Sequence, residues 1–195
     1  RSAPWLRDLA STYASCISQP CMRLFFALAA AEGMIVTFGD TTNAYQQSPP
    51  PTEQCYLTID DAYLSWYKKR YNLDLDPRTH VIPVLKALQG HPEAGALWER
   101  KINGILQRLG FQSTTHERSL YSGKLDGHTV LISRMVDDYA VACRDKATST
   151  KLLALLNDQV TTENKGTDEG RYNGVDVVQS RTYIKLHCET YIDRM

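Results

Sequence analysis

The chain has 195 residues, of which 43% are hydrophobic, and its 22 lysines and arginines balance its 22 aspartates and glutamates. This length and composition indicate a folded unit that can bury a core, and no apolar run reaches the roughly 18 residues that a membrane-spanning helix needs, so we expect no membrane partner. The five cysteines include no Cys-x-x-Cys pair, which argues against a structural zinc site.

Helices and strands are predicted to alternate along the first half of the chain. Pro20 opens a helix over residues 20–32 that stops near Gly33, and the apolar run after it predicts a strand ending at Asp40. Three consecutive prolines at 49–51 then require a loop. Further along, the pattern predicts a strand over 54–59, a helix over 60–71, and a strand over 81–88 whose internal proline indicates an edge or a bulge.

The second half begins with the clearest helix signal. Residues 92–109 carry apolar side chains at helical spacing between an opening proline and a closing glycine. An Asp-Gly pair predicts a hairpin turn at 124–128, and a helix over 145–160 is expected to pack Leu152, Leu153, Leu155 and Leu156 on the sheet. Two final strands are predicted near 172–178 and 182–186.

The segment Met135-Val136-Asp137-Asp138 lies between two apolar runs, 129–132 and 139–143, that are typical of buried strands. Adjacent carboxylates beside such strands repel each other and lose hydration unless a cation, a proton or a hydrogen-bond donor compensates them. A divalent cation is the compensator that brings chemistry. The alternative interpretation is a polar hairpin turn, in which aspartate is common.

Asp40 ends the predicted strand that begins near Met34. A phosphoryl-transfer site with two cations about 3.5–4 Å apart needs at least two bridging carboxylates from separate elements. Asp40 and Asp137 are candidates for that pair, while an ordinary strand-end carboxylate is the alternative for Asp40.

Several segments, in the same order, resemble the reverse transcriptase domain of copia-type retrotransposons. Asp40-Thr41-Thr42-Asn43-Ala44-Tyr45 is similar to the family's Asp-Val-Lys-Asn-Ala-Phe block, and Met135 to Asp138 takes the place of Tyr-Val-Asp-Asp. Residues 84–98 are similar to its Leu-Lys-Lys-Ser-Leu-Tyr-Gly-Leu-Lys-Gln-Ala-Pro-Arg-Ala-Trp block. The resemblance runs from about Tyr13 to Ile192 and also includes residues 23–31, 54–57, 109–111, 119–121, 172–175 and 190–192.

The resemblance implies an α+β fold, namely a polymerase palm-type antiparallel sheet covered by helices, with partial fingers and no thumb. Residues 1–195 would form this one palm and partial fingers domain, cut from a longer polyprotein, since the chain begins at Arg1 without an initiating methionine. The implied activity is RNA-directed DNA polymerisation, in which deoxynucleotides are added to a primer by two-metal-ion phosphoryl transfer.

The same resemblance assigns roles to the carboxylates. Asp40, Asp137 and Asp138 would be catalytic and would hold two Mg²⁺ ions, with Mn²⁺ as an alternative, and the backbone carbonyl of Thr41 would be a further ligand.

Four further residues are implied to bind substrate. Tyr45 would lie beneath the sugar and favour deoxynucleotides, with a core tyrosine as the alternative. Gln89 and Gly90 resemble the Leu-Pro-Gln-Gly block of retroviral reverse transcriptases, in which the glutamine lies against the incoming nucleotide. Met135 replaces the usual tyrosine and so exchanges an aromatic contact to the primer end for a flexible thioether.

The implied partners are an RNA template, a DNA primer, deoxynucleoside triphosphates, and the fingers, thumb, RNase H and integrase of the polyprotein. The implied location is a cytoplasmic virus-like particle, with nuclear import as an alternative, and the implied wider process is DNA integration. Because the net charge is zero, we expect this chain alone to bind template weakly, with the other lobes carrying more of the basic surface.

A catalytically inactive retroelement remnant that keeps a palm-like scaffold is the competing hypothesis. Met135, the neutral charge and the absent lobes fit it, whereas the intact aspartates argue against it because they are costly in a pure scaffold. A two-metal nuclease would explain neither Gln89-Gly90 nor the order of the blocks.

Overall fold

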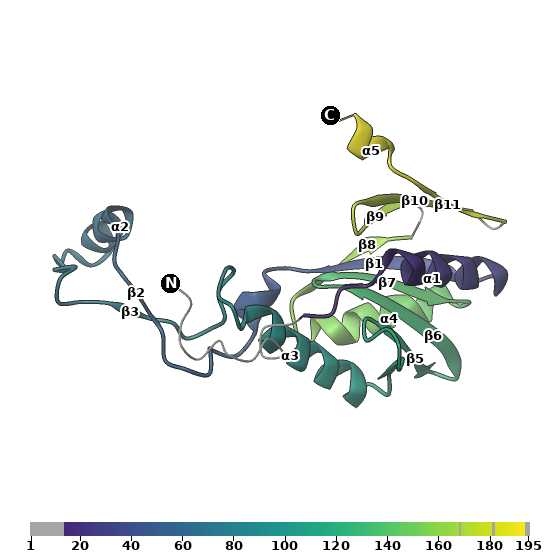
Figure 1. The fold of residues 1–195 in the computed structure, drawn as a ribbon, viewed down its shortest axis with the longest axis horizontal. Coiled ribbons are helices and arrows are strands. Elements are labelled where there is room, and N and C mark those ends of the chain that lie inside the picture. Colours follow the sequence, from purple (N-terminus) through teal and green to yellow (C-terminus); the bar gives the residue numbers. More distant parts are fainter. Residues whose placement is uncertain (1–13, 168, 181, 194–195) are drawn as a thin grey trace.

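The computed structural model describes residues 14–167, 169–180 and 182–193, so Tyr13, where the resemblance begins, lies outside the described residues. Its centre is a six-stranded antiparallel sheet in the order β4-β5-β6-β7-β1-β8 (Figure 1). The strands are β1 (Ile35–Thr41), β4 (Gln112–Ser113), β5 (Leu120–Leu125), β6 (His128–Met135), β7 (Asp138–Cys143) and β8 (Thr162–Gly166). The sheet and its helices form the mixed α+β architecture that the sequence predicts.

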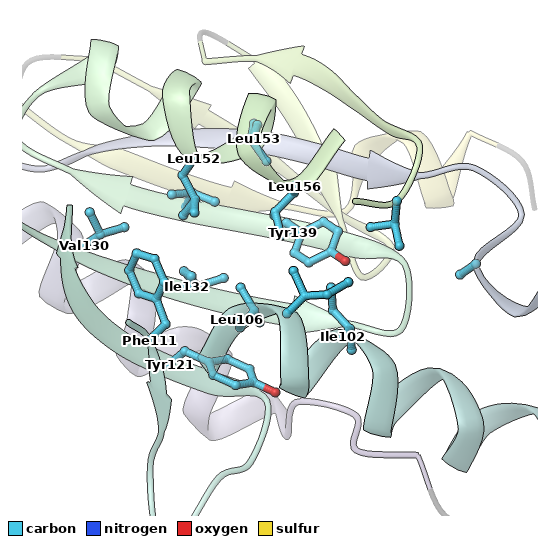
Figure 2. Close-up of a cluster of buried hydrophobic side chains, with 14 of the residues drawn as sticks. Ile102, Leu106, Phe111, Tyr121, Val130, Ile132, Tyr139, Leu152, Leu153 and Leu156 are labelled. Carbon is cyan, nitrogen blue, oxygen red and sulfur yellow. The ribbon is translucent and has the colours of Figure 1, made fainter. Parts of the chain in front are cut away.

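Two helices, α3 (Ala94–Arg108) and α4 (Lys146–Asn157), cover one face of this sheet. Figure 2 shows their side chains Ile102, Leu106 and Leu152 directed toward Val130, Ile132 and Tyr139 of the strands. These side chains are fully buried, so this cluster supplies the larger part of the hydrophobic stabilisation. The carboxylate of Asp145 caps α4 by accepting from the backbone N–H groups of Ala147 and Thr148.

The opposite face packs against helix α1 (Gln19–Ala31) and a second, three-stranded sheet in the order β11-β10-β9. The remaining bounds are β9 (Glu169–Tyr172), β10 (Val175–Gln179), β11 (Ile184–His187) and a short helix α5 (Glu189–Ile192). Side chains alternate between the two faces along each strand, as a β-strand requires. On β7, for example, Tyr139 and Val141 belong to the first cluster, whereas Ala140 and Ala142 belong to the second.

Residues 54–83 form an arm that Figure 1 shows standing apart from the main sheet. It contains β2 (Tyr56–Leu57), α2 (Asp61–Tyr71) and β3 (Ile82–Pro83), and it follows a short 3₁₀ helix, η2 (Ala44–Gln47). Asp60 caps α2 through the backbone N–H of Tyr63, but no residue of α2 is buried. The arm therefore keeps its helix without a hydrophobic core beneath it.

The predicted helices agree with α1, α2, α3 and α4 to within a few residues, whereas several strands differ. The strands expected over 54–59 and 81–88 are reduced to two paired residues each, because they pair only with each other and Pro83 lacks a backbone donor. The strand expected over 172–178 is two strands, β9 and β10, joined by Asn173-Gly174, whose φ values of 51° and 76° are those of a tight hairpin.

Two smaller differences concern the main sheet. Strand β8 was not predicted, since its sequence is polar, and it pairs with β1 at an edge of the sheet. Leu155 is only half-buried, while Leu152, Leu153 and Leu156 are buried as predicted. Among the described residues, none of the helices combines the length and the apolar character needed to cross a bilayer.

Candidate active site

The hairpin between β6 and β7 carries the paired aspartates, with Asp137 in its two-residue loop, Val136-Asp137, and Asp138 directly after it. Met135 ends β6 and pairs with Asp138, the first residue of β7. Val136 has a φ of 55°, a left-handed conformation that costs a β-branched residue about 1–2 kcal/mol. The surrounding structure must therefore hold this turn in place.

Three hydrogen bonds hold the backbone of the turn. The carbonyl of Val136 accepts from the indole Nε1 of Trp98 at 2.7 Å and from Nη1 of Arg134 at 3.1 Å. The carbonyl of Asp137 accepts from the backbone N–H of Thr41 at 2.8 Å. Helix α3, strand β6 and strand β1 thus each fix the loop, which offsets the cost of its backbone conformation.

Arg134 is a buried cation behind the turn. Its guanidinium forms an ion pair with Glu99 of α3, and its side chain has no exposed surface. Burial lowers the pKa of Arg134, but Glu99 and the neighbouring tyrosines outweigh that effect and hold the pKa above its ordinary value. The guanidinium is therefore charged. Its role in the turn is to hold the Val136 carbonyl by a hydrogen bond, and it does not exchange protons.

Asp40 and Asp138 are directly opposite each other on neighbouring strands. Their Cα atoms are register partners in the β1–β7 pair, with Met135 beyond Asp138 on β6 and Glu163 beyond Asp40 on β8. The alternation of faces places both carboxylates on the side of the sheet that packs on α1, at its rim.

Gly39 makes this approach of strand and helix possible. A Cβ atom at position 39 would lie 2.6 Å from Cδ2 of Leu153, which packs from α4. A side chain at position 39 would push the Leu153 side chain aside, so glycine before Asp40 lets that leucine of α4 pack directly on β1.

Burial and neighbouring carboxylates raise the pKa values of Asp137 and Asp138. Burial, followed by the charges of Asp137 and Asp40, raises the pKa of Asp138 to about 6. Burial and the charge of Asp40 also raise the pKa of Asp137. Lys165 is a nearby cation, with Nζ 4.0 Å from Oδ2 of Asp40, but it is exposed and pairs more closely with Glu163. The rim therefore carries negative charge that the protein compensates only in part.

A pocket of about 140 Å³ lies beside the turn and is lined by Asp137, Val136, Tyr45, Gln89 and their neighbours in η2. Burial, and then the charge of Asp137, raises the pKa of Tyr45. Gly90 follows Gln89 in an exposed turn with a φ of 88° and has open space around its Cα. Residues 43–46 and Gln89, distant in sequence, thus meet Asp137 in one concave site.

The other predicted ligands and contacts lie as follows. The side chain of Thr41 is buried and hydrogen-bonds Tyr139 and Thr162, which leaves only its backbone as a candidate ligand. Met135 is half-buried against the second core cluster and forms an isolated antiparallel bridge with Cys16. Within the described residues, no group of three His, Cys, Asp or Glu side chains is already arranged to hold a metal ion.

Comparison with known families decides the identity of the domain. Residues 6–195 match the model of a family described as reverse transcriptase (RNA-dependent DNA polymerase). The chain belongs to this family, in its copia-type branch. No curated protein matches the sequence significantly. The family as a whole implies nucleic acid and nucleotides as substrates.

Sequence reasoning missed several residues around this reverse transcriptase site. Trp98, Glu99 and Arg134 hold the turn from behind, and Glu163 and Lys165 stand beside Asp40 on β8. Trp98 lies in the family block at 84–98 and joins the first core cluster, and only its indole N–H indicates a second role. A charged residue inside the apolar run 130–135 was the available signal for Arg134.

Proposed function

We propose that this domain is the palm and part of the fingers of a copia-type reverse transcriptase, and that it adds deoxynucleotides to a primer on an RNA template. The observation that carries the proposal is the meeting of Asp40 and Asp138 on adjacent strands with Asp137 in the connecting turn, next to a pocket that contains Tyr45 and Gln89. Carboxylates from separate elements beside a concave site are what phosphoryl transfer needs.

Divalent cations fit the donor set of this rim. Carboxylate oxygens are the ligands that Mg²⁺ and Mn²⁺ prefer. Burial, and then the charge of neighbouring carboxylates, raises the pKa values of Asp137 and Asp138, and a bound cation would offset both effects. Asp40, Asp137 and Asp138 would hold two ions, with the Thr41 carbonyl as a further ligand. When bound, such ions activate a primer hydroxyl and neutralise charge on the triphosphate.

The chain's own residues contribute positioning. Trp98 and Arg134 fix the Val136 carbonyl and so set the direction of Asp137. Gln89, at the mouth of the pocket, would contact the incoming nucleotide, with the conformation of Gly90 turning the chain there. Met135, beside Asp138 on the next strand, would lie under the primer end.

Tyr45 would select the sugar. Its ring lines the pocket with Asp137, where it would clash with a ribose 2′-hydroxyl. Tyr45→Ala, in a version of the protein extended at both ends, should admit ribonucleotides. Unchanged sugar selectivity in primer extension would remove this role.

The decisive experiment is magnesium-dependent primer extension on an RNA template, again with the extended version. Asp137→Asn removes one ligand charge with little change in shape, so extension should fall by about 100-fold or more. A folded, extended wild-type protein that copies nothing would instead favour an inactive remnant with a palm-like scaffold.

The remaining parts of the proposal follow from the family context. The other fingers, the thumb, RNase H and integrase of a polyprotein would be covalent partners, and a cytoplasmic virus-like particle the location, with nuclear import before DNA integration.

A further inference from the structure

A basic groove lies between α3 and the segment that contains Gln47, Pro49 and Pro50. It has a volume of about 580 Å³, with Leu97 and Ile105 among its apolar lining residues. Four cations line it, Lys86 from the loop before Gln89 and Arg100, Lys101 and Arg108 from α3, and no acidic residue is among its lining residues. In a chain with zero net charge, this is a marked local concentration of positive charge.

These cations have little internal compensation. Within the described residues, none of the four forms an ion pair, whereas six other lysines and arginines do. Lys101 donates from Nζ to the backbone carbonyl of Gln47, which is a neutral acceptor. Burial and the adjacent charge of Lys86 lower the pKa of Lys101. An anion in the groove would gain from all four charges without displacing a carboxylate.

The spacing of the cations fits a chain of anions better than a single one. Arg100, Gly104 and Arg108 follow one another at intervals of four residues, so they share one side of the helix over about 12 Å. Gly104 leaves the helix surface bare between the two arginines, and a Cβ there would meet only Nη1 of Arg108, at 3.5 Å. A strand that carries one phosphate per nucleotide matches such a row.

We propose that this groove binds the sugar-phosphate backbone of a single-stranded nucleic acid, separately from the pocket that contains Tyr45 and Asp137. Because both the loop and the helix contribute cations to the lining, one strand in the groove would contact cations from both. No aromatic residue is among the groove's lining residues, so binding there is independent of base sequence. Gln47 lines the groove two residues after Tyr45, so a strand held there leads toward the candidate active site.

Binding of a labelled single-stranded oligonucleotide of about 16 nucleotides, followed by fluorescence anisotropy at several salt concentrations, tests the inference. The protein is the full 195-residue chain, with EDTA present. The double variant Arg100→Gln/Arg108→Gln should bind about tenfold more weakly, and the slope of log affinity against log salt should fall by about 1.4, or 0.7 for each lost phosphate contact.

The matched control is Arg23→Gln/Lys124→Gln, which makes the same change in net charge. Both residues are exposed, on α1 and β5, and form no ion pair within the described residues. The control should bind like the wild type, as should Asp137→Asn, so groove binding and polymerase activity can fail independently.

Three outcomes would overturn the inference. The first is an equal loss of oligonucleotide affinity in both double variants, and the second is an unchanged salt slope in the groove variant. The third is that binding to vesicles rich in phosphatidylserine requires Arg100 and Arg108 whereas binding to the oligonucleotide does not. Circular dichroism of each variant confirms that the fold is retained.

Discussion

The sheet and the arm solve the problem of holding a functional residue in different ways. The turn with Asp137 is fixed by Trp98, Arg134 and Thr41, all of which are buried or lie in buried strands. The arm has a capped helix whose aromatic residues contact one another and whose charges pair at the surface. Trp98 is fully buried, whereas Trp66 is 50% exposed.

The difference shows where precise geometry is available in this chain. Side chains in the sheet are positioned by close packing and by hydrogen bonds in low dielectric, which resist displacement. Helix α2, with 11 residues and none buried, is short for a helix that must be stable by itself in water. The candidate catalytic residues therefore lie at the rim of the sheet, whereas helix α2 of the arm presents only exposed and half-buried residues.

The largest contrast is expected between the two tryptophans. Trp98→Ala removes a buried ring and a hydrogen bond to the turn, so the free energy of unfolding should fall by about 3–5 kcal/mol. Trp66→Ala should change it by about 0.5 kcal/mol or less. Urea unfolding followed by circular dichroism measures both, and equal losses would refute the contrast between sheet and arm.

The ion pairs should differ in the same direction. Glu99→Gln leaves the Arg134 guanidinium buried without its partner charge and should cost about 3 kcal/mol. The Lys68–Asp74 pair of the arm is 2.9 Å long but mostly exposed, so Asp74→Asn should cost about 0.5 kcal/mol or less. The same urea experiment applies. A loss for Glu99→Gln as small as that for Asp74→Asn would show that water reaches Arg134.

Asp138 should make stability depend on pH. The folded protein raises the pKa of Asp138 from 3.8 to about 6. Protonation of Asp138 therefore contributes fully to the free energy of unfolding below pH about 4, and this contribution is lost as the pH rises through about 6. Asp138→Asn cannot ionise and should be more stable than the wild type above that range, by about 1–2 kcal/mol once solvent screening is allowed for.

Thermal unfolding of the wild type and Asp138→Asn between about pH 4 and pH 8 tests this direction of the pH dependence. The two end points are each about two pH units from the pKa of Asp138. The two stability curves should converge at the acidic end, and Mg²⁺ should stabilise the wild type more than Asp138→Asn at neutral pH. Parallel curves over the whole range would contradict the coupling of the three carboxylates.

Much of the fold was predictable because helices have local sequence signals, namely capping residues and apolar spacing. Asp60 and Asp145 are acidic caps in front of α2 and α4, and the apolar spacing of α3 identified its buried face. The predicted strand near 172–178 leaves out most of β9, because Glu169, Gly170 and Arg171 show no apolar pattern, although Asn173-Gly174 is a strong hairpin signal. Strand β8 had no apolar pattern to detect, since it lies at an edge.

The candidate site was predictable to a different degree. The positions of Asp40, Asp137 and Asp138 followed from the order of the family blocks, and their roles stay predictions. The supporting contacts of Trp98, Glu99 and Arg134 depend on tertiary packing between α3 and the β6–β7 turn, which no local pattern encodes.

Trp98 and Glu99 are consecutive residues, and through the indole and the Arg134 guanidinium they reach the same carbonyl. The start of α3 and the tip of the hairpin are therefore linked through one peptide group. A substitution or a ligand that shifts the start of α3 would shift the Val136 carbonyl next to Asp137, and a misplacement of about 1 Å at a reacting group can cost about 100-fold in rate.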